Sequence, residues 1–266
     1  MKLDFDLGNT RLKWHLQADA HSEYGAVAWD ELDISSNALN KLQNTLSKLN
    51  ADGIEATDVL VSSVASPKTE ELFNHWLDEK LSVKAHYIQV EKQFCGLVAA
   101  YEDVSRLGVD RWLGMIAAKE MKPGFCIVID AGSAITIDYL NASGQHRGGL
   151  IVPGLSLLCR SMSSGTYNLS PESLTLTQNW QPGCDTVSGI SQGASAMYSG
   201  LVKEALSYYI KEAAKQSEKV NLFLSGGDAK AFLPWCEALL PPEYIVLKET
   251  LVLDGIECWR QHTLRG

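Results

Sequence analysis

The sequence lacks the motifs by which most nucleotide-binding proteins are recognised. It contains no Gly-x-x-x-x-Gly-Lys-Ser/Thr loop, which excludes a P-loop nucleotidase. None of its 21 glycines has another glycine two positions away. This excludes both the dinucleotide-binding fingerprint and the glycine-rich loop of protein kinases. Any nucleotide would therefore be held by turns of another kind.

Clusters of cysteine and histidine are also missing. None of the six cysteines forms a C-x-x-C pair, and the six histidines form no H-x-H or H-E-x-x-H cluster. The sequence therefore predicts no zinc site. Cysteines with such long and irregular spacings are expected to be buried, reduced thiols of a cytoplasmic protein.

Segments for export, for a membrane or for nucleic acid are not expected either. No apolar run approaches the roughly 18 residues that a membrane span needs. Asp4 and Asp6 interrupt the N-terminal segment where a signal peptide would require an apolar run. The net charge of −9 argues against a basic surface for nucleic acid. We expect a cytoplasmic protein that binds neither membrane nor nucleic acid.

Enough apolar sequence is present for more than one core. Apolar residues make up 45% of the 266 residues, charged residues make up 21%, and no long block of one charge occurs. Such a composition is that of a folded protein rather than a disordered one. The length favours two packed domains over one.

One pattern occurs twice, and it suggests an internal duplication. Leu3, Phe5 and Leu7 alternate with Asp4 and Asp6, which predicts a half-buried strand. A Gly8-Asn9-Thr10 turn and a second alternating strand follow, so we expect a β-hairpin. Residues 125–139 repeat this order of strand, Asp-x-Gly, small residue and strand, so that Asp6 matches Asp130 and Gly8 matches Gly132, 124 residues later. We therefore predict two related domains, 1–122 and 123–266.

Other elements are predicted from periodicity and from cap residues. Ser66 followed by Pro67 is typical of a helix start. The remaining expected elements are a strand at 24–29, a helix at 39–49, a strand at 59–61, helices at 106–121 and 197–214, a strand at 220–224, a helix at 229–240 and a strand at 244–247.

The two Asp-x-Gly turns suit the binding of phosphate. A tight turn with glycine exposes consecutive backbone N–H groups, which can surround phosphate oxygens. Asn9, Thr10 and Ser133 add side-chain donors, and Lys13 adds a positive charge. Asp6 and Asp130, at the strand ends beside these turns, could hold Mg²⁺ or another cation directly or through water.

Together with three further segments, these turns resemble the motifs of the type III pantothenate kinases. Residues 6–13, DLGNTRLK, resemble the first phosphate motif D-x-G-N-T-x-x-K, and residues 130–138, DAGSAITID, resemble the second. Residues 108–112, GVDRW, resemble the pantothenate motif. Gly148-Gly149 with Pro153-Gly154-Leu155, and Ser225-Gly226-Gly227-Asp228, also fit in the same order. The resemblance implies an α/β fold of two duplicated ribonuclease-H-like domains, as in actin and sugar kinases, with a nucleotide cleft between them.

The resemblance also implies roles for individual residues. ATP would be bound by Asp6, Leu7, Gly8, Asn9, Thr10, Arg11, Leu12, Lys13 and Ser133, the last standing where the family usually has threonine. Pantothenate would be bound by Tyr101, Gly108, Val109, Asp110, Arg111 and Thr186, although the stretch around Thr186 matches more loosely. Asp110 would be the catalytic base, Asp130 the ligand of K⁺ or NH₄⁺, and Asp6 would hold Mg²⁺, directly or through water. A homodimer is implied, with Thr186 in its own site or its partner's.

Two other functions remain open at this point. One is a different small-molecule kinase of the same superfamily, against which the segment GVDRW argues. The other is a non-catalytic regulator that has kept the fold. The presence of Asp6, Lys13, Asp110 and Arg111 argues for an active enzyme.

Overall fold

Two compact units make up the chain. The computed structural model describes residues 1–18, 21–28, 44, 46, 58–163 and 174–263. Unit 1 consists of Met1–Lys92, Asp103–Ala117 and Val252–Gly266, and unit 2 consists of Gln93–Glu102 and Ala118–Leu251. The helix expected at 39–49 lies almost wholly outside the described residues.

Unit 1 is built on a mixed sheet of five strands with the order β3-β2-β1-β4-β5. Antiparallel pairing joins β1 to β2 and β2 to β3, whereas β4 is parallel to β1 and β5 is parallel to β4. The predicted hairpin and the strand predicted at 59–61 are confirmed. The strands are β1 (Lys2–Leu7), β2 (Arg11–Ala18), β3 (His21–Ala28), β4 (Asp58–Ser63) and β5 (His86–Tyr87).

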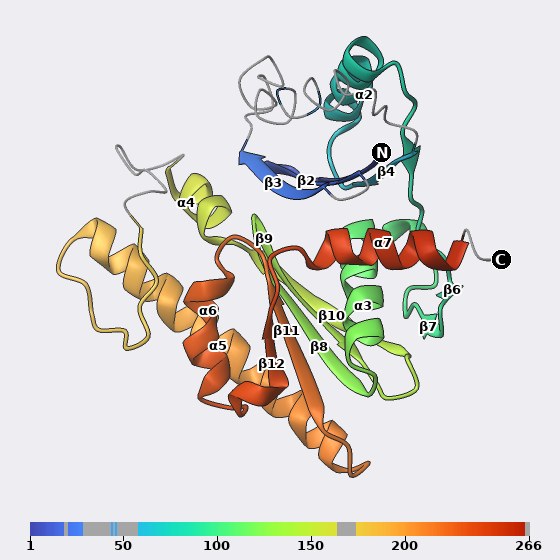
Figure 1. The fold of residues 1–266 in the computed structure, drawn as a ribbon. Helices are drawn as coiled ribbons and strands as arrows, with labels where there is room; N and C mark the ends of the chain where they lie inside the picture. Colours follow the sequence, from blue (N-terminus) through green and yellow to red (C-terminus); the bar gives the residue numbers. More distant parts are fainter. Residues whose placement is uncertain (19–20, 29–43, 45, 47–57, 164–173, 264–266) are drawn as a thin grey trace. The chain divides into compact units, whose positions relative to one another are not determined.

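Strand β1 is buried on both of its faces, so the prediction of a half-buried strand was wrong. On one face, Phe5 meets Phe73 of helix α2 (Pro67–Leu81) edge to face, with ring centroids 5.0 Å apart. On the other face of the sheet lies helix α7 (Leu251–Thr263) (Figure 1). Asp4 is 1% exposed and is paired with Arg260 of this helix. The sequence alone suggested that this face is exposed, because the helix that buries it, α7, comes about 250 residues later in the chain.

Helix α2 begins where the sequence predicted. The Ser66 hydroxyl accepts a hydrogen bond from the Thr69 N–H at 3.2 Å, and Pro67 occupies the first turn. The helix ends at Leu81 and is capped by Ser82, whose backbone adopts a left-handed conformation with φ of 53°. Phe73, Trp76 and Leu77 point into the core of unit 1.

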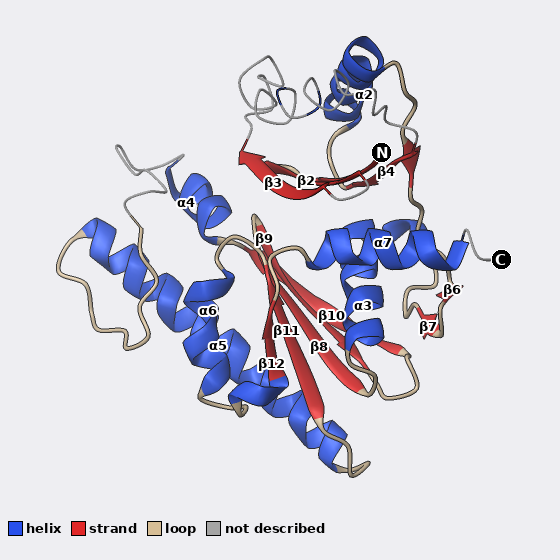
Figure 2. Cartoon of the chain, in the orientation of Figure 1, coloured by secondary structure: helices blue, strands red, loops and turns tan. Residues whose placement is uncertain are grey.

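Unit 2 repeats the sheet of unit 1. Its strand order is β10-β9-β8-β11-β12, with β8, β9 and β10 antiparallel and with β11 and β12 parallel to β8 (Figure 2). This equivalence confirms the duplication and the predicted fold class, two ribonuclease-H-like sheets in one chain. The strands are β8 (Phe125–Ala131), β9 (Ala134–Leu140), β10 (His146–Pro153), β11 (Val220–Ser225) and β12 (Ile245–Leu247).

Two helices, α5 (Thr186–Ala214) and α6 (Ala229–Glu237), cover one face of this sheet (Figure 2). Tyr198, Val202 and Leu206 of α5 and Phe232 of α6 join Ile127 in one buried cluster. Helix α5 starts 11 residues before the predicted start at 197, because Asp185 and Ser188 form a reciprocal capping box there. Helix α6 ends three residues before the predicted end at 240.

The remaining elements join strands along the chain. They are β6 (Gln93–Phe94), β7 (Leu97–Val98), the short 3₁₀ helices η1 (Val104–Arg106) and η3 (Pro242–Tyr244), and helices α3 (Val109–Met121) and α4 (Leu155–Ser163). Helix α3 begins at Val109 rather than at Arg106, because Asp103 caps a separate 3₁₀ turn before it.

The predicted domain ranges, 1–122 and 123–266, follow the sequence repeat, and they stay a prediction. The compact units differ from them because residues 93–102 group with unit 2 and the closing helix groups with unit 1.

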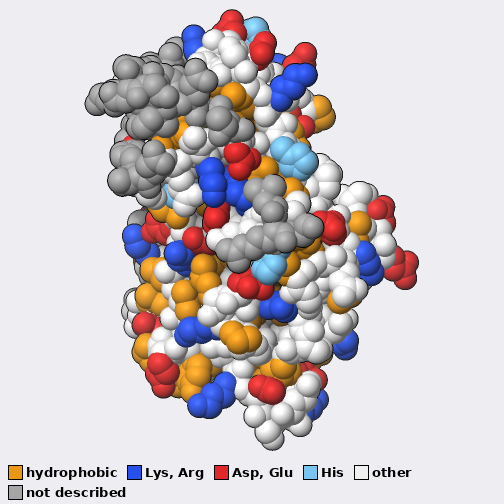
Figure 3. Space-filling view, turned by 45° about the vertical axis from the view of Figure 1, so that its right-hand side comes forward, with side chains coloured by type: hydrophobic (Ala, Val, Ile, Leu, Met, Phe, Trp, Pro, Cys, Tyr) orange, Lys and Arg blue, Asp and Glu red, His pale blue; other side chains and the backbone are white. Residues whose placement is uncertain are grey.

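The six cysteines differ in their exposure. Cys126, Cys159 and Cys236 are buried as expected, and Cys95 and Cys258 are partly buried. Cys184 is exposed, so the expectation of burial was wrong for Cys184. Among the described residues on the face drawn in Figure 3, Lys and Arg side chains lie among Asp and Glu and form no continuous basic surface. No helix within the described ranges has both the length and the apolar character needed to cross a bilayer.

Candidate active site

The first Asp-x-Gly turn joins β1 to β2 at one end of the sheet of unit 1. The Gly8 N–H donates to the Arg11 carbonyl oxygen at 3.0 Å, which closes the turn. Asn9 is exposed and Thr10 is half-buried. Lys13 lies opposite Asp6 in the strand register, with its Nζ 4.0 Å from Asp6 Oδ2. The turn, a carboxylate and an ammonium group therefore lie together, as the sequence predicted.

The second turn joins β8 to β9 in unit 2, and two other turns pack tightly against it. The Gly132 N–H donates to the Ala134 carbonyl at 3.1 Å, and the Gly154 N–H donates to the Ser133 carbonyl at 2.8 Å. A Cβ atom on Gly154 would lie 2.1 Å from the Gly132 carbonyl oxygen, and one on Gly226 would lie 2.4 Å from Ala131. Both glycines are therefore required by close approach of the backbones.

These three turns surround the end of β8. The Asp228 N–H donates to the Ala131 carbonyl at 2.9 Å, which fixes the Ser225–Asp228 segment beside the turn. Helix α4 starts just after Gly154, and helix α6 starts just after Asp228. Backbone N–H groups at two helix starts thus adjoin the predicted phosphate turn, an arrangement that favours anions.

Each of the two key carboxylates has a buried serine beside it. Ser62 of β4 is the register partner of Asp6, and Ser225 of β11 is the register partner of Asp130. Both hydroxyls are buried, and neither has a hydrogen-bond partner among the described residues. A buried hydroxyl without a partner is costly. Because the same position recurs in both sheets, the fold provides a hydroxyl suited to water or a bound group at each carboxylate.

A metal at these carboxylates would rely on few protein ligands. Among the described residues, no group of three or more His, Cys, Asp or Glu side chains converges on a point. Such a donor set does not fit a cation enclosed by protein. It fits Mg²⁺ held mainly by phosphate oxygens and water, which commonly uses only one or two carboxylates.

The predicted pantothenate motif lies at the start of α3 in unit 1. The Trp112 N–H donates to the Gly108 carbonyl at 3.1 Å, and the Arg111 N–H donates to Asp110 Oδ1 at 2.7 Å. A Cβ atom on Gly108 would lie 2.5 Å from that same oxygen. The glycine therefore leaves space for the Asp110 carboxylate.

Arg111 is buried, with 8% of its surface exposed, and is not the solvated surface residue that an arginine near a helix start usually is. A cavity of about 390 Å³ lies between the end of β4 and the turns that precede α3. Residues that come shortly before Arg111 in the chain line it. Its lining includes Gly108 and Val109, together with Ser63, Val64, Ala65, Ile88, Gln89, Val90, Val104, Ser105, Arg106 and Leu107.

Two predicted contact residues belong to the other unit. Tyr101 follows β7 and is half-buried, and Thr186 is the exposed first residue of α5. The structure thus brings Gly108, Val109, Asp110 and Arg111 together in one helical turn. It places Tyr101 and Thr186 in unit 2, along with Asp130 and Ser133.

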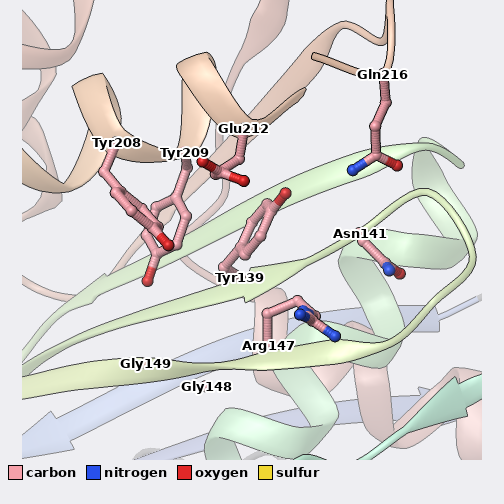
Figure 4. A pocket seen from close by; sticks show the side chains of 9 residues that line it. All are labelled: Tyr139, Asn141, Arg147, Gly148, Gly149, Tyr208, Tyr209, Glu212 and Gln216. Carbon is pink, nitrogen blue, oxygen red and sulfur yellow. The ribbon is translucent and has the colours of Figure 1, made fainter. Parts of the chain in front are cut away.

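A second cavity, of about 530 Å³, was not indicated by the sequence. Figure 4 shows Tyr208, Tyr209 and Glu212 reaching from α5 toward Tyr139 of β9, with Arg147 extending from β10. Burial, with Glu212 nearby, raises the pKa of Tyr139 to about 12. Asn141, at its edge, follows the end of β9 opposite to the Gly132–Ser133 turn, so this cavity lies apart from the predicted phosphate site.

A segment with the pattern of a hydrolase nucleophile does not have the structure that this role requires. Gly189-Ile190-Ser191-Gln192-Gly193 has the Gly-x-Ser-x-Gly form of a hydrolase nucleophile elbow. It lies inside α5 rather than on a strand-to-helix turn. The Ser191 hydroxyl is buried and accepts from the Thr175 N–H at 3.3 Å, so it has a structural role.

Comparison with known proteins agrees with these features. A family model described as type III pantothenate kinase matches residues 2–207. A type III pantothenate kinase of Teredinibacter turnerae is 36% identical over 97% of this chain and 100% of its own length. One from Pseudoalteromonas translucida is 35% identical over 97% of this chain and 96% of its own.

The fold is also found among solved structures. The crystal structure of a conserved putative Baf family transcriptional activator from Campylobacter jejuni has a TM-score of 0.55 to this chain at 19% identity. The match covers 99% of this chain and 100% of that one. At this identity the likeness supports the fold alone.

Proposed function

The chain belongs to the type III pantothenate kinase family, and on that premise we propose how its own residues carry out the reaction. It is a kinase that phosphorylates pantothenate with ATP, a reaction of coenzyme A biosynthesis. The observation that carries the assignment is the family match over residues 2–207, within which the Asp6 turn, the Asp110 motif and the Asp130 turn all fall.

The two Asp-x-Gly turns bind the phosphates of ATP in this proposal. Support comes from the turn closed by Gly8 and from the convergence of Gly154 and Gly226 on the Gly132–Ser133 turn. Lys13 places its ammonium group beside the first turn, where it neutralises phosphate charge. Phosphoryl transfer depends mainly on such positioning and charge neutralisation. The other residues of 6–13 shape the turn and its flanking strands.

Two cations complete the proposed nucleotide site. Mg²⁺ would be held at Asp6 through water, and a monovalent cation, K⁺ or NH₄⁺, would be held at Asp130. The unpaired Ser62 and Ser225 hydroxyls in register with these carboxylates support such hydrated sites. Mg²⁺, when bound, neutralises the negative charge of the phosphate oxygens.

Asp110 is the proposed general base. As the pantothenate hydroxyl oxygen bonds to the γ-phosphorus, the bond to the β-phosphate oxygen breaks, and the hydroxyl proton passes to the Asp110 carboxylate. The Arg111 N–H fixes the carboxylate by donating to Oδ1 at 2.7 Å, and the first turn of α3 favours a negative charge there. Proton transfer to a positioned group of this kind contributes about 10²–10⁴ in rate.

Arg111 is the proposed partner of the pantothenate carboxylate. Its guanidinium can donate two parallel hydrogen bonds to a carboxylate, and the small exposed fraction of the residue, 8%, favours a strong contact. Gly108 and Val109 line the adjoining cavity of about 390 Å³. Tyr101 and Thr186 would contact the same substrate, Thr186 in its own site or in that of a partner subunit.

A homodimer is proposed from the surface of unit 2. Edge strand β10 exposes Leu150 (41%) and Ile151 (59%), and α5 exposes Met197 (43%) and Tyr208 (60%). Large apolar side chains on an edge strand favour coverage by another chain. Sedimentation of Ile151→Lys should show a shift from dimer toward monomer, whereas an unchanged mass would exclude β10 from the interface.

A cytoplasmic location stays a prediction.

The test of the function is substrate-dependent turnover. The purified chain is given ATP, Mg²⁺ and pantothenate, with and without K⁺, and formation of ADP and of phosphorylated pantothenate is measured. Glucose and acetate in place of pantothenate test for another kinase of the superfamily. Asp110→Asn provides the inactive control. A folded protein that consumes no ATP with pantothenate would favour the non-catalytic regulator instead.

A further inference from the structure

A buried carboxylate–histidine pair, Asp138 with His146, has no part in the chemistry described above. His146 Nε2 and Asp138 Oδ1 lie 3.0 Å apart, and their side chains are 0% and 1% exposed. Asp138 stands on β9, and His146 begins β10. An extra residue between His146 and Gly149 shifts the pairing of the two strands. Such a bulge commonly re-aims a side chain near a functional site.

The second ring nitrogen of His146 contacts the segment that carries Tyr101. The Ala100 N–H donates to His146 Nδ1 at 3.4 Å, so Nδ1 is the acceptor and the ring proton is on Nε2, which donates to Asp138. The Tyr101 ring lies parallel to the imidazole, with an interplanar angle of 8° and centroids 6.2 Å apart. One histidine thus contacts both the backbone before Tyr101 and the tyrosine ring.

The rest of this segment is fixed farther from Tyr101. Lys119 Nζ donates to the Cys95 carbonyl at 2.7 Å, and the Val98 N–H donates to the Gly144 carbonyl at 3.0 Å. A Cβ atom on Gly144 would lie 2.1 Å from the Gly96 carbonyl oxygen, so the two turns touch. These contacts hold residues 95–98. Beyond them, Ala100 and Tyr101 both contact His146.

We propose that Asp138 and His146 form a positioning pair that sets the Tyr101 ring for pantothenate. Asp138 fixes the tautomer and orientation of the imidazole, as a carboxylate does behind other functional histidines. The imidazole in turn fixes Ala100 and the plane of the Tyr101 ring. This inference rests on the proposed function, because it takes Tyr101 as a pantothenate contact. The alternative is that the pair only stabilises unit 2.

A double-mutant cycle on His146 and Tyr101 separates these roles. The dissociation constant of pantothenate is measured by calorimetry with a non-hydrolysable ATP analogue present, and the KM values of both substrates are measured beside it. His146→Phe keeps a ring but loses both hydrogen bonds. We expect it to raise the Kd and KM for pantothenate about five- to tenfold, the effect of losing roughly one hydrogen bond, with the KM for ATP unchanged. In a Tyr101→Ala background, His146→Phe should change the Kd and KM for pantothenate by less than about twofold, since the two positions are coupled.

Two further variants make the outcome decisive. In His146→Asn the amide oxygen can accept from the Ala100 N–H in place of Nδ1, so affinity should recover in part; no recovery would argue against that contact. If His146→Phe does not fold, His146→Gln enters the same cycle. His146→Phe could instead raise the Kd for pantothenate by the same factor with Tyr101 and with Tyr101→Ala, and lower the melting temperature. That result would overturn the inference in favour of a pair that only stabilises the fold. A wild-type protein that binds no pantothenate would overturn the proposed function itself, and this inference with it.

Discussion

The Arg260 guanidinium donates to both carboxylate oxygens of Asp4, a residue 256 positions earlier in the chain. Both side chains are almost fully buried, and Arg260 also donates to Asp58 at 2.8 Å and to Glu257 at 2.7 Å. Burial raises the pKa of Asp4, and the hydrogen bond and charge of Arg260 act against that rise. One guanidinium thus joins strands β1 and β4 to helix α7.

Arg260→Leu should lower the free energy of unfolding by about 3–5 kcal/mol, because it leaves the buried Asp4 carboxylate without its cation. Denaturant titration followed by circular dichroism measures the change. The matched control is Lys230→Ala, which breaks the exposed Lys230–Glu249 pair (2.9 Å, 75% and 60% exposed) and should cost less than about 1 kcal/mol. Equal losses in the two variants would contradict the central role of Arg260.

Asp110→Asn should lower kcat by about 10²–10⁴ and change the KM for pantothenate less. Asparagine has nearly the same shape and can still accept from the Arg111 N–H, but it cannot usefully accept a proton at neutral pH. Steady-state kinetics are measured on a variant shown to be folded and of wild-type mass. If kcat stays within about threefold of wild type, well below the usual effect, Asp110 only orients the alcohol.

Arg111→Lys should raise the KM for pantothenate and leave the KM for ATP nearly fixed. Lysine keeps the charge but cannot form two parallel hydrogen bonds to one carboxylate. The two KM values are measured at saturating concentrations of the other substrate. A parallel rise of both would indicate that buried Arg111 supports the fold rather than the substrate.

Asp6→Asn should shift the Mg²⁺ dependence of activity to higher concentration while the melting temperature changes little. Asparagine preserves the size of the side chain but removes the charge that would hold a hydrated cation. Activity is titrated against Mg²⁺, with exposed Asp78→Asn on α2 as the matched control. A wild-type titration curve for Asp6→Asn would remove this carboxylate from the site.

Thiol labelling should distinguish the exposed cysteine from the buried ones. Burial raises the pKa of Cys126 and of Cys236 to about 12, so both stay protonated at pH 7 and at pH 9. With a thiol-reactive dye the native protein should show a fast phase that Cys184→Ser abolishes. Cys126 and Cys236 should react only after denaturation. Their rapid labelling in the native protein would contradict the burial.

Local signals in the sequence predicted local structure well. Ser66-Pro67 correctly marked the start of α2, and the two Asp-x-Gly turns correctly marked two hairpins, because turn and cap chemistry acts over a few residues. The repeated pattern predicted the duplicated fold for the same reason. The capping box of Asp185 and Ser188 was equally local and was missed, since the glycines that follow it weaken the helical pattern.

Long-range contacts could not be predicted in this way. Nothing near Asp4 indicates that Arg260 will cover it, and nothing near Tyr101 indicates His146, 45 residues later. The burial of Arg111 likewise depends on its packing in unit 1 rather than on its neighbours in the sequence. Motifs therefore predicted the family and its reaction, whereas these long-range contacts became visible only in the folded chain.

The pairing of Asp4 with Arg260 also determines the order in which the chain can mature on the ribosome. Synthesis runs from the N-terminus, and domains generally fold as units while the chain emerges. Strand β1 precedes the other described strands in the chain, yet Asp4 on it has to wait for its partner Arg260 until position 260 has been translated. Each strand described in unit 2 precedes that residue in the chain and is therefore synthesised before it. The half of the protein that is synthesised first is thus the half that is completed last.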